Sequence, residues 1–138
     1  MTNPKSTIYY RNAVKDLCIY YNEDELNFFS YLRNQYDTSK DELDTLERNG
    51  FNETAIRNGI YVLATGLLTY GQIEVVQDIV DNVPTSGKVR RLTNLLPIVL
   101  PLPDDVNKDD KLGLLNWLKN NQDCLMWNES ELRFDFNE

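Results

Sequence analysis

The 138 residues predict a mainly α-helical protein, a single compact helical domain of about six or seven helices with a short C-terminal β-hairpin. Three observations lead to this fold class. Apolar residues recur at steps of three and four along most of the chain, which is the period of a buried helix face. Capping and helix-stopping residues separate these segments. Alternation typical of strands begins only near the C-terminus.

The longest uncharged apolar segment, Gly59–Ile73, predicts the central helix of the domain. We expect this helix to start after the N-cap residue Asn52 and to end at Tyr70-Gly71. Gly59 and Gly66 lie seven residues apart on nearly one helix face, where they mark either a close helix crossing or a ligand groove. The apolar positions surround the helix, which indicates neighbours on most sides: Ile56, Ile60, Leu63, Leu67 and Tyr70, with Val62, Ala64 and Leu68 opposite.

Three further helices are expected before it. The first spans about Ser6–Tyr21, and the second starts at Asn22, where residues 22–25 resemble a capping box. Residues 39–42 repeat the capping pattern and predict a short third helix that stops at Asn49-Gly50. Their inward positions are Tyr10, Val14, Leu17, Cys18 and Tyr21 in the first, Leu26, Phe29, Leu32 and Tyr36 in the second, and Leu43 and Leu46 in the third.

Two helices are expected directly after the central one. Residues 72–83 form the first, which Pro84 ends. Thr85 or Ser86 caps the second, which carries Val89, Leu92, Leu95 and Leu96 inward and stops at Pro97.

The C-terminal part predicts three different elements. The prolines in residues 97–107 are incompatible with a helix and predict an extended apolar strap that lies against the domain. A helix over residues 108–121 should present Leu112, Leu115 and Leu118 inward. Residues 124–136 alternate and predict the terminal hairpin.

Composition points to a cytoplasmic protein. The net charge is −8, 41% of the residues are hydrophobic, and the start of the chain does not resemble a signal peptide. The longest apolar run is shorter than the roughly 20 residues of a membrane helix, so no membrane association is expected. Cys18 and Cys124 are predicted to be buried reduced thiols, with one long-range disulfide as the alternative.

The chemistry that the sequence lacks argues against an enzyme. Without histidine, the chain cannot form a Ser-His-Asp or Cys-His nucleophile, and two cysteines do not complete a structural zinc site. Residues 105–109 resemble the start of a calcium loop, but Asp110 stands where glycine is required. No phosphate-binding glycine motif occurs. We therefore predict no cofactor and no metal, and a carboxylate-based enzyme is the remaining catalytic alternative.

Acidic residues form two blocks. Residues 22–54 contain nine acids and three bases, residues 104–138 contain nine and four, and the segment between them has a net charge of +1. We interpret the first block as a binding face for a partner protein with a basic surface. The alternative is that acidic faces only keep the protein soluble. The binding positions predicted from this block are Glu23, Asp24, Asp41 and Asp44.

Two further groups of residues suggest contacts. Four tyrosines in the first helix exceed what a core needs, and Tyr9 and Tyr20 are predicted to be aromatic binding positions; packing under loops is the alternative. Lys88, Arg90 and Arg91 form a basic patch at a helix start, where the helix dipole disfavours cations. Either ion pairs with the acidic blocks or a phosphate or acidic partner would make this placement tolerable.

A resemblance covers about residues 56–138. The motif Tyr61-x-x-Ala64, the segment TYGQIEVVQDIVDNVPTSGKVRRL, a Trp-bearing helix and the tail WNESELRFDF together resemble small uncharacterised accessory proteins of tailed bacteriophages. The inserted segment PIVLPLPDDVNKDDK departs from that pattern. The resemblance implies an accessory role in the host cytoplasm and brings no catalytic residues. A weaker likeness to death-fold-like adaptor domains, through residues 22–26 and 70–73, implies an interaction module.

The sequence therefore predicts a non-catalytic acidic protein-binding module, a phage-encoded accessory or inhibitor protein that acts on a host or phage protein. One alternative is an accessory protein of DNA metabolism that contacts nucleic acid through the basic patch. A net charge of −8 weighs against nucleic acid as a partner. The other alternative is a death-fold-like adaptor. The residues do not indicate an oligomeric state.

Overall fold

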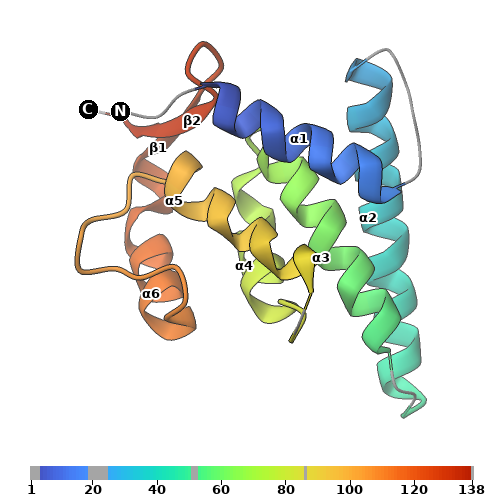
Figure 1. Cartoon of the computed structure of the whole chain (residues 1–138). Helices are drawn as coiled ribbons and strands as arrows, with labels where there is room; N and C mark the ends of the chain where they lie inside the picture. Colours follow the sequence, from blue (N-terminus) through green and yellow to red (C-terminus); the bar gives the residue numbers. More distant parts are fainter. Residues whose placement is uncertain (1–3, 19–24, 51–52, 86, 138) are drawn as a thin grey trace.

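The computed structural model describes residues 4–18, 25–50, 53–85 and 87–137. Within these ranges the chain forms six α-helices and one antiparallel hairpin (Figure 1), which confirms the predicted fold class. The α-helices are α1 (Pro4–Cys18), α2 (Glu25–Arg48), α3 (Thr54–Leu68), α4 (Val76–Asp81), α5 (Leu96–Val99) and α6 (Lys111–Asn121). Three 3-10 helices, η1 (Ile73–Val75), η2 (Lys88–Leu95) and η3 (Gln122–Cys124), and two strands, β1 (Leu125–Asn128) and β2 (Arg133–Phe136), complete the chain.

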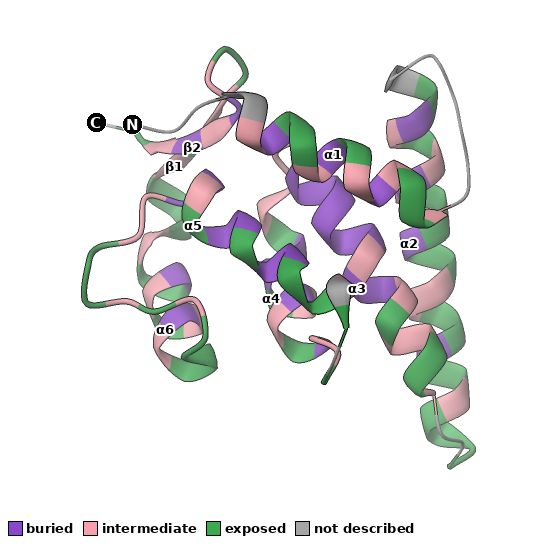
Figure 2. Cartoon of the chain, viewed as in Figure 1, coloured by how far each residue is buried: buried purple, intermediate pink, exposed green. Residues whose placement is uncertain are grey.

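Helix α3 is the centre of the molecule, as the sequence predicts. Figure 2 shows its second half buried, and residues such as Ile60, Leu67 and Leu68 have no exposed surface. Contacts with α1, α2, α4 and η2 surround it. The helix ends at Leu68, and the following turn passes through Gly71, whose φ of 87° is one that glycine adopts easily. The expected N-cap, Asn52, lies outside the described residues. None of the described helices is long and apolar enough to cross a membrane.

The two glycines of α3 have different surroundings. A Cβ atom on Gly66 would lie 2.8 Å from Val14 Cγ1 and 3.0 Å from Leu32 Cδ1. Gly66 therefore allows α1 and α2 to approach the backbone of α3, as expected for a close helix crossing. A Cβ atom on Gly59 would meet no atom within 4 Å. The crossing explains only one of the two glycines.

Helix α2 corrects the prediction of two separate helices in this region. It continues without a break past Ser39, which was expected to cap a new helix. No glycine or proline interrupts residues 25–48, and the buried face continues from Tyr36 to Leu43, so packing carries the helix through the capping motif. Phe28, which the sequence pattern missed, is fully buried beside Leu32. Asn22 and the side chain of Leu26 lie outside the described residues.

The chain around Pro97 also differs from expectation. Residues 88–95 form a 3-10 helix rather than an α-helix. Its N-cap residue is Gly87, without a side-chain cap, rather than Thr85. Ser86 lies outside the described residues. Pro97 occupies the first turn of α5, where a missing backbone N–H costs nothing, so the helical conformation continues through it. The extended strap begins at Leu100, three residues later than predicted.

Three apolar positions point the other way from the prediction. Leu112 is 79% exposed in the first turn of α6, which starts at Lys111 after the N-cap Asp110. The helix buries Leu118, as predicted, together with Leu114, which was not predicted to be inward. Leu17 is exposed at the end of α1. Cys124 is exposed in η3, so the prediction of a buried thiol is wrong there; both cysteines are free.

The terminal hairpin holds one end of the core. Its register pairs Leu125 with Phe136 and Trp127 with Phe134. The Trp127 ring covers Gly71, where a Cβ atom would lie 2.6 Å from the ring. Thr7 Oγ1 of α1 donates a hydrogen bond of 2.9 Å to the carbonyl oxygen of Leu132 in the hairpin turn. The hairpin is thus attached both to the end of α3 and to α1.

Candidate functional site

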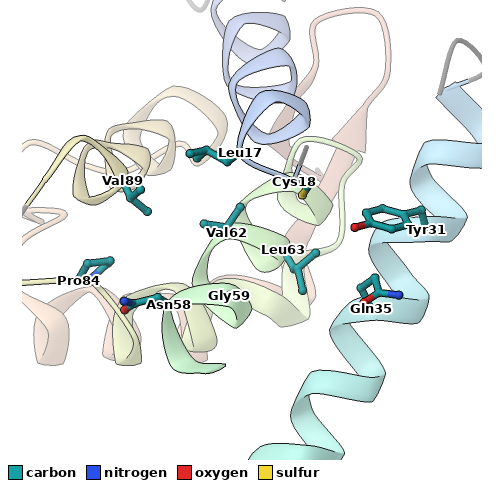
Figure 3. Close-up of a pocket in the computed structure, with 10 residues that line it drawn as sticks. All are labelled: Leu17, Cys18, Tyr31, Gln35, Asn58, Gly59, Val62, Leu63, Pro84 and Val89. Carbon is teal, nitrogen blue, oxygen red and sulfur yellow. The ribbon is translucent and has the colours of Figure 1, made fainter. Parts of the chain in front are cut away.

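A concave groove opens on the side of α3 that its neighbours leave uncovered (Figure 3). Its volume is about 440 Å³. The groove, called the α3 groove below, has walls from four parts of the chain: Leu17 and Cys18 from α1, Tyr31 and Gln35 from α2, Asn58, Gly59, Val62 and Leu63 from α3, and Pro84 and Val89 from the segment that leads into and includes the start of η2.

Gly59 lies in this groove. Its missing side chain leaves open space, and the side chains of Asn58 and Val62 flank it in Figure 3. The sequence alone left a close helix crossing and a ligand groove as alternatives for the two glycines. Gly66 lies at a close crossing, and Gly59 lines the groove, for which ligand binding stays a prediction.

The described lining of the groove carries no charged side chain. Leucine, valine and proline form half of the wall, and Gln35 and Asn58 contribute amide groups that can both donate and accept hydrogen bonds. Burial raises the pKa of the Cys18 thiol to about 11, so the thiol is neutral near pH 7. Neutral thiols are poor nucleophiles, and Cys18 therefore contributes to the groove as a small apolar group.

A second concavity adjoins the groove. This tyrosine cleft has a volume of about 600 Å³, lies between α1 and η2, and shares Leu17 and Val89 with the α3 groove. Tyr9 and Arg91, which the sequence assigned to separate groups, both line it. Tyr9 is 68% exposed and meets Tyr10 edge to face, with 5.3 Å between the ring centroids. Burial, followed by the effect of Tyr9, raises the pKa of Tyr10.

The described part of the basic patch, Arg90 and Arg91, does not form the ion pairs that were one explanation for its position. Arg90 and Arg91 are exposed, and neither makes an ion pair within the part of the chain that the structure describes. Exposure to water and salt makes their place at the start of η2 tolerable, because solvent screens their charge. The side chain of Lys88 lies outside the described residues.

The structure describes only part of the predicted acidic face. Glu23, Asp24 and the aromatic position Tyr20 lie outside the described residues. Asp41 and Asp44 are exposed on α2, three residues apart and therefore neighbours on the helix surface. Glu42 lies between them and is also exposed. We call these three residues the acidic turn.

The carboxylates next to the acidic turn are engaged in ion pairs. Asp37 lies 3.6 Å from Arg33, and Glu47 lies 2.7 Å from Arg57. Among the described residues, the three carboxylates of the acidic turn pair with no base and accept no hydrogen bond. The acidic turn therefore carries three carboxylates without an ion pair, although the base Arg48 lies beside it and donates a hydrogen bond of 3.3 Å to the backbone carbonyl of Asp44.

A further ion-paired carboxylate, Asp78, joins two helices. The Asp78 side chain in α4 accepts a hydrogen bond from the Tyr36 hydroxyl and lies 2.9 Å from Lys40 Nζ, so it ties α4 to α2. Burial and this carboxylate raise the pKa of Tyr36. In the described part of the chain, no three cysteine or carboxylate side chains come close enough to hold a metal ion.

No family model, curated protein or solved structure matches this chain.

Proposed function

We propose that this protein is a non-catalytic protein-binding module whose acidic turn contacts a basic surface on a partner protein. The observation that carries the proposal is that Asp41, Glu42 and Asp44 form no ion pair among the described residues, on a helix whose neighbouring acids Asp37 and Glu47 are paired.

Physical reasons favour a partner over solvent for this turn. Asp41 and Asp44, three positions apart, are neighbours on the helix surface and repel each other, and a complementary basic surface would relieve that repulsion. Charge of this kind acts mainly on the rate of encounter, because it steers the partner before contact. Helix α2 is long and firmly packed through Leu32, Tyr36 and Leu43, so it would present the acidic turn on a rigid support.

The resemblance of residues 56–138 to bacteriophage accessory proteins leads us to propose a host cell as the setting. On that reading the chain is a phage-encoded accessory or inhibitor protein, and its partner is a host or phage protein with a basic surface. Its surface charge suits a partner that normally binds nucleic acid, because such a partner has a basic groove.

The test is a charge reversal at the acidic turn. Immobilised protein would capture partners from a bacterial lysate, and mass spectrometry would identify them. The association rate of the purified partner should then fall by about tenfold or more in Asp41→Lys/Asp44→Lys, and the wild-type rate should fall as salt increases. Circular dichroism should show an unchanged fold, because both side chains are exposed.

A matched control changes the same amount of charge elsewhere. Asp104→Lys/Asp105→Lys alters two exposed acids of the second acidic block and gives the same net charge as the first variant. We expect it to slow association much less. If the two double variants and the wild type bind the partner at equal rates, the acidic turn is only a solvated surface and the proposal is wrong.

One observation favours a second candidate function. The tyrosine cleft brings Tyr9 and Arg91 together, and stacking aromatics beside arginine are typical of proteins that bind single-stranded nucleic acid. Arg90 and Arg91 are also free of ion pairs in the described chain. The overall charge of −8 opposes this function, since phosphate would be repelled everywhere else.

A further inference from the structure

We propose that the α3 groove is a binding site for a small uncharged molecule that is mostly apolar and carries one hydrogen-bonding group. The groove lies apart from the acidic turn, and this second proposal does not depend on the first.

The lining sets the chemistry of the ligand. In a chain of which 26% of the residues are charged, no described side chain in the groove is charged. A charged ligand would lose its hydration there without gaining a counter-charge, which is unfavourable. The apolar wall from Leu17, Val62 and Leu63 suits an apolar body, and the amides of Gln35 and Asn58 provide a partner for one polar group.

The size and shape of the groove set the scale of the ligand. Its volume of about 440 Å³ falls within the range of roughly 300–1,000 Å³ that is usual for small-molecule sites. Its walls come from α1, α2, α3 and the segment that leads into η2, so a ligand would contact several elements while one side of it faces solvent.

Gly59 provides an independent observation. Glycine weakens a helix interior relative to alanine, so its presence in a central helix needs a reason. Close packing is that reason at Gly66, but no atom would obstruct a Cβ atom at Gly59. A side chain at position 59 would instead occupy the open groove. The space that Gly59 leaves is where the ligand would lie.

The surroundings of the groove favour a small molecule over a segment of another protein. A stable protein interface covers about 800 Å² on each partner and has an apolar centre. Of the six large apolar side chains most exposed in the described chain, Leu17 alone lines the groove. Leu112, Met126 and Phe136 belong to the C-terminal elements. Apart from Leu17, the most exposed apolar side chains of the described chain therefore lie outside the groove, and Tyr9 lines the adjoining tyrosine cleft.

The experiment uses indole and 2-naphthol, two uncharged aromatic molecules that each carry one hydrogen-bond donor. Both are titrated into the full-length protein and followed by ¹H–¹⁵N NMR. We expect saturable shifts at the amides of Asn58 and Val62. Gly59→Leu should weaken binding by about tenfold or more, because the new side chain fills the site. Gln35→Ala should weaken it as well, and since Gln35 is exposed, this variant keeps the fold.

Two controls separate the groove from general apolar binding. Leu112→Gln removes the most exposed leucine of the described chain and should leave the affinity of both probes unchanged. The second control compares the rates at which N-ethylmaleimide alkylates the two cysteines of the same protein at pH 9. Indole should slow the reaction of Cys18, which lines the groove, and leave that of the exposed Cys124 unchanged. The alkaline pH is chosen because the raised pKa of Cys18 leaves little reactive thiolate at neutral pH.

Three outcomes would overturn the proposal. In the first, neither probe at millimolar concentration shifts the groove amides or protects Cys18. In the second, Gly59→Leu and Gln35→Ala both bind the probes as tightly as the wild type. In the third, a captured partner protein protects Cys18 while neither probe does, which would assign the groove to a protein segment.

Discussion

The two glycines of α3 should respond in opposite directions to the same substitution. Gly59→Ala adds a methyl group to open space and improves helix propensity, so the free energy of unfolding should rise by about 0.5–1 kcal/mol. Gly66→Ala forces the new methyl group against Val14 and Leu32. The resulting overpacking should lower the free energy of unfolding by about 1–3 kcal/mol. Urea denaturation of both variants measures the two changes.

The pair also checks the placement of the helix crossing. Each variant serves as the control for the other, because both make the same chemical change in the interior of the same helix. Equal effects of the two substitutions would mean that α1 and α2 do not approach α3 at Gly66. A destabilised Gly59→Ala would mean that the groove is filled by the protein itself.

At the scale of elements, the contact of α2 with α4 depends on a polar cluster at the edge of the core. The Asp78 side chain, 16% exposed, accepts a hydrogen bond from the Tyr36 hydroxyl and pairs with Lys40. Lys40 lies in the middle of α2, in the motif that was predicted to start a separate helix. The cluster therefore helps to explain why α2 remains continuous there.

Asp78→Ala should lower the free energy of unfolding by about 1–3 kcal/mol, because a half-buried hydroxyl and an ammonium group lose their acceptor. Asp81→Ala is the matched control in the same helix. Asp81 pairs with Lys111 at 2.7 Å, and Lys111 is more exposed than Lys40. Asp81→Ala should therefore lower the free energy of unfolding by at most about 1 kcal/mol. Thermal and urea unfolding compare the two. Similar losses in both variants would show that the Asp78 cluster contributes no more than a surface ion pair.

At the scale of the whole molecule, charge decides between partner classes. The chain has a net charge of −8, and its uncompensated acids in the described part include the acidic turn, while Arg90 and Arg91 offer a small basic area beside the tyrosine cleft. Repulsion of phosphate by the whole protein acts at long range, whereas two arginines act locally.

We expect no binding to single-stranded or duplex DNA in a fluorescence anisotropy assay at low salt, where electrostatic attraction is strongest. The control is Arg90→Ala/Arg91→Ala, which should behave like the wild type. Binding that weakens steeply with salt and disappears in this double variant would replace the protein-binding proposal with the nucleic-acid one.

Local pattern was enough to predict the central helix, the hairpin and the fold class. The apolar period around Ile60, Leu63 and Leu67 is so dense that any compact fold has to surround this helix, and the alternation near Trp127 and Phe134 permits a strand pair. The charge pattern predicted an acidic face that includes Asp41 and Asp44, and both are exposed, while their role in binding stays a prediction.

Tertiary packing decided the rest. A capping motif at Ser39 does not end a helix whose buried face continues from Tyr36 to Leu43, because burial of that face outweighs a local alternative. The paths of α1 and α2 over α3 determine that Gly66 is packed and Gly59 is open. These paths leave no periodic signal in the sequence. The meeting of Tyr9 with Arg91, 82 positions apart in the chain, likewise results from the docking of η2 beside α1, which is a property of the assembled fold.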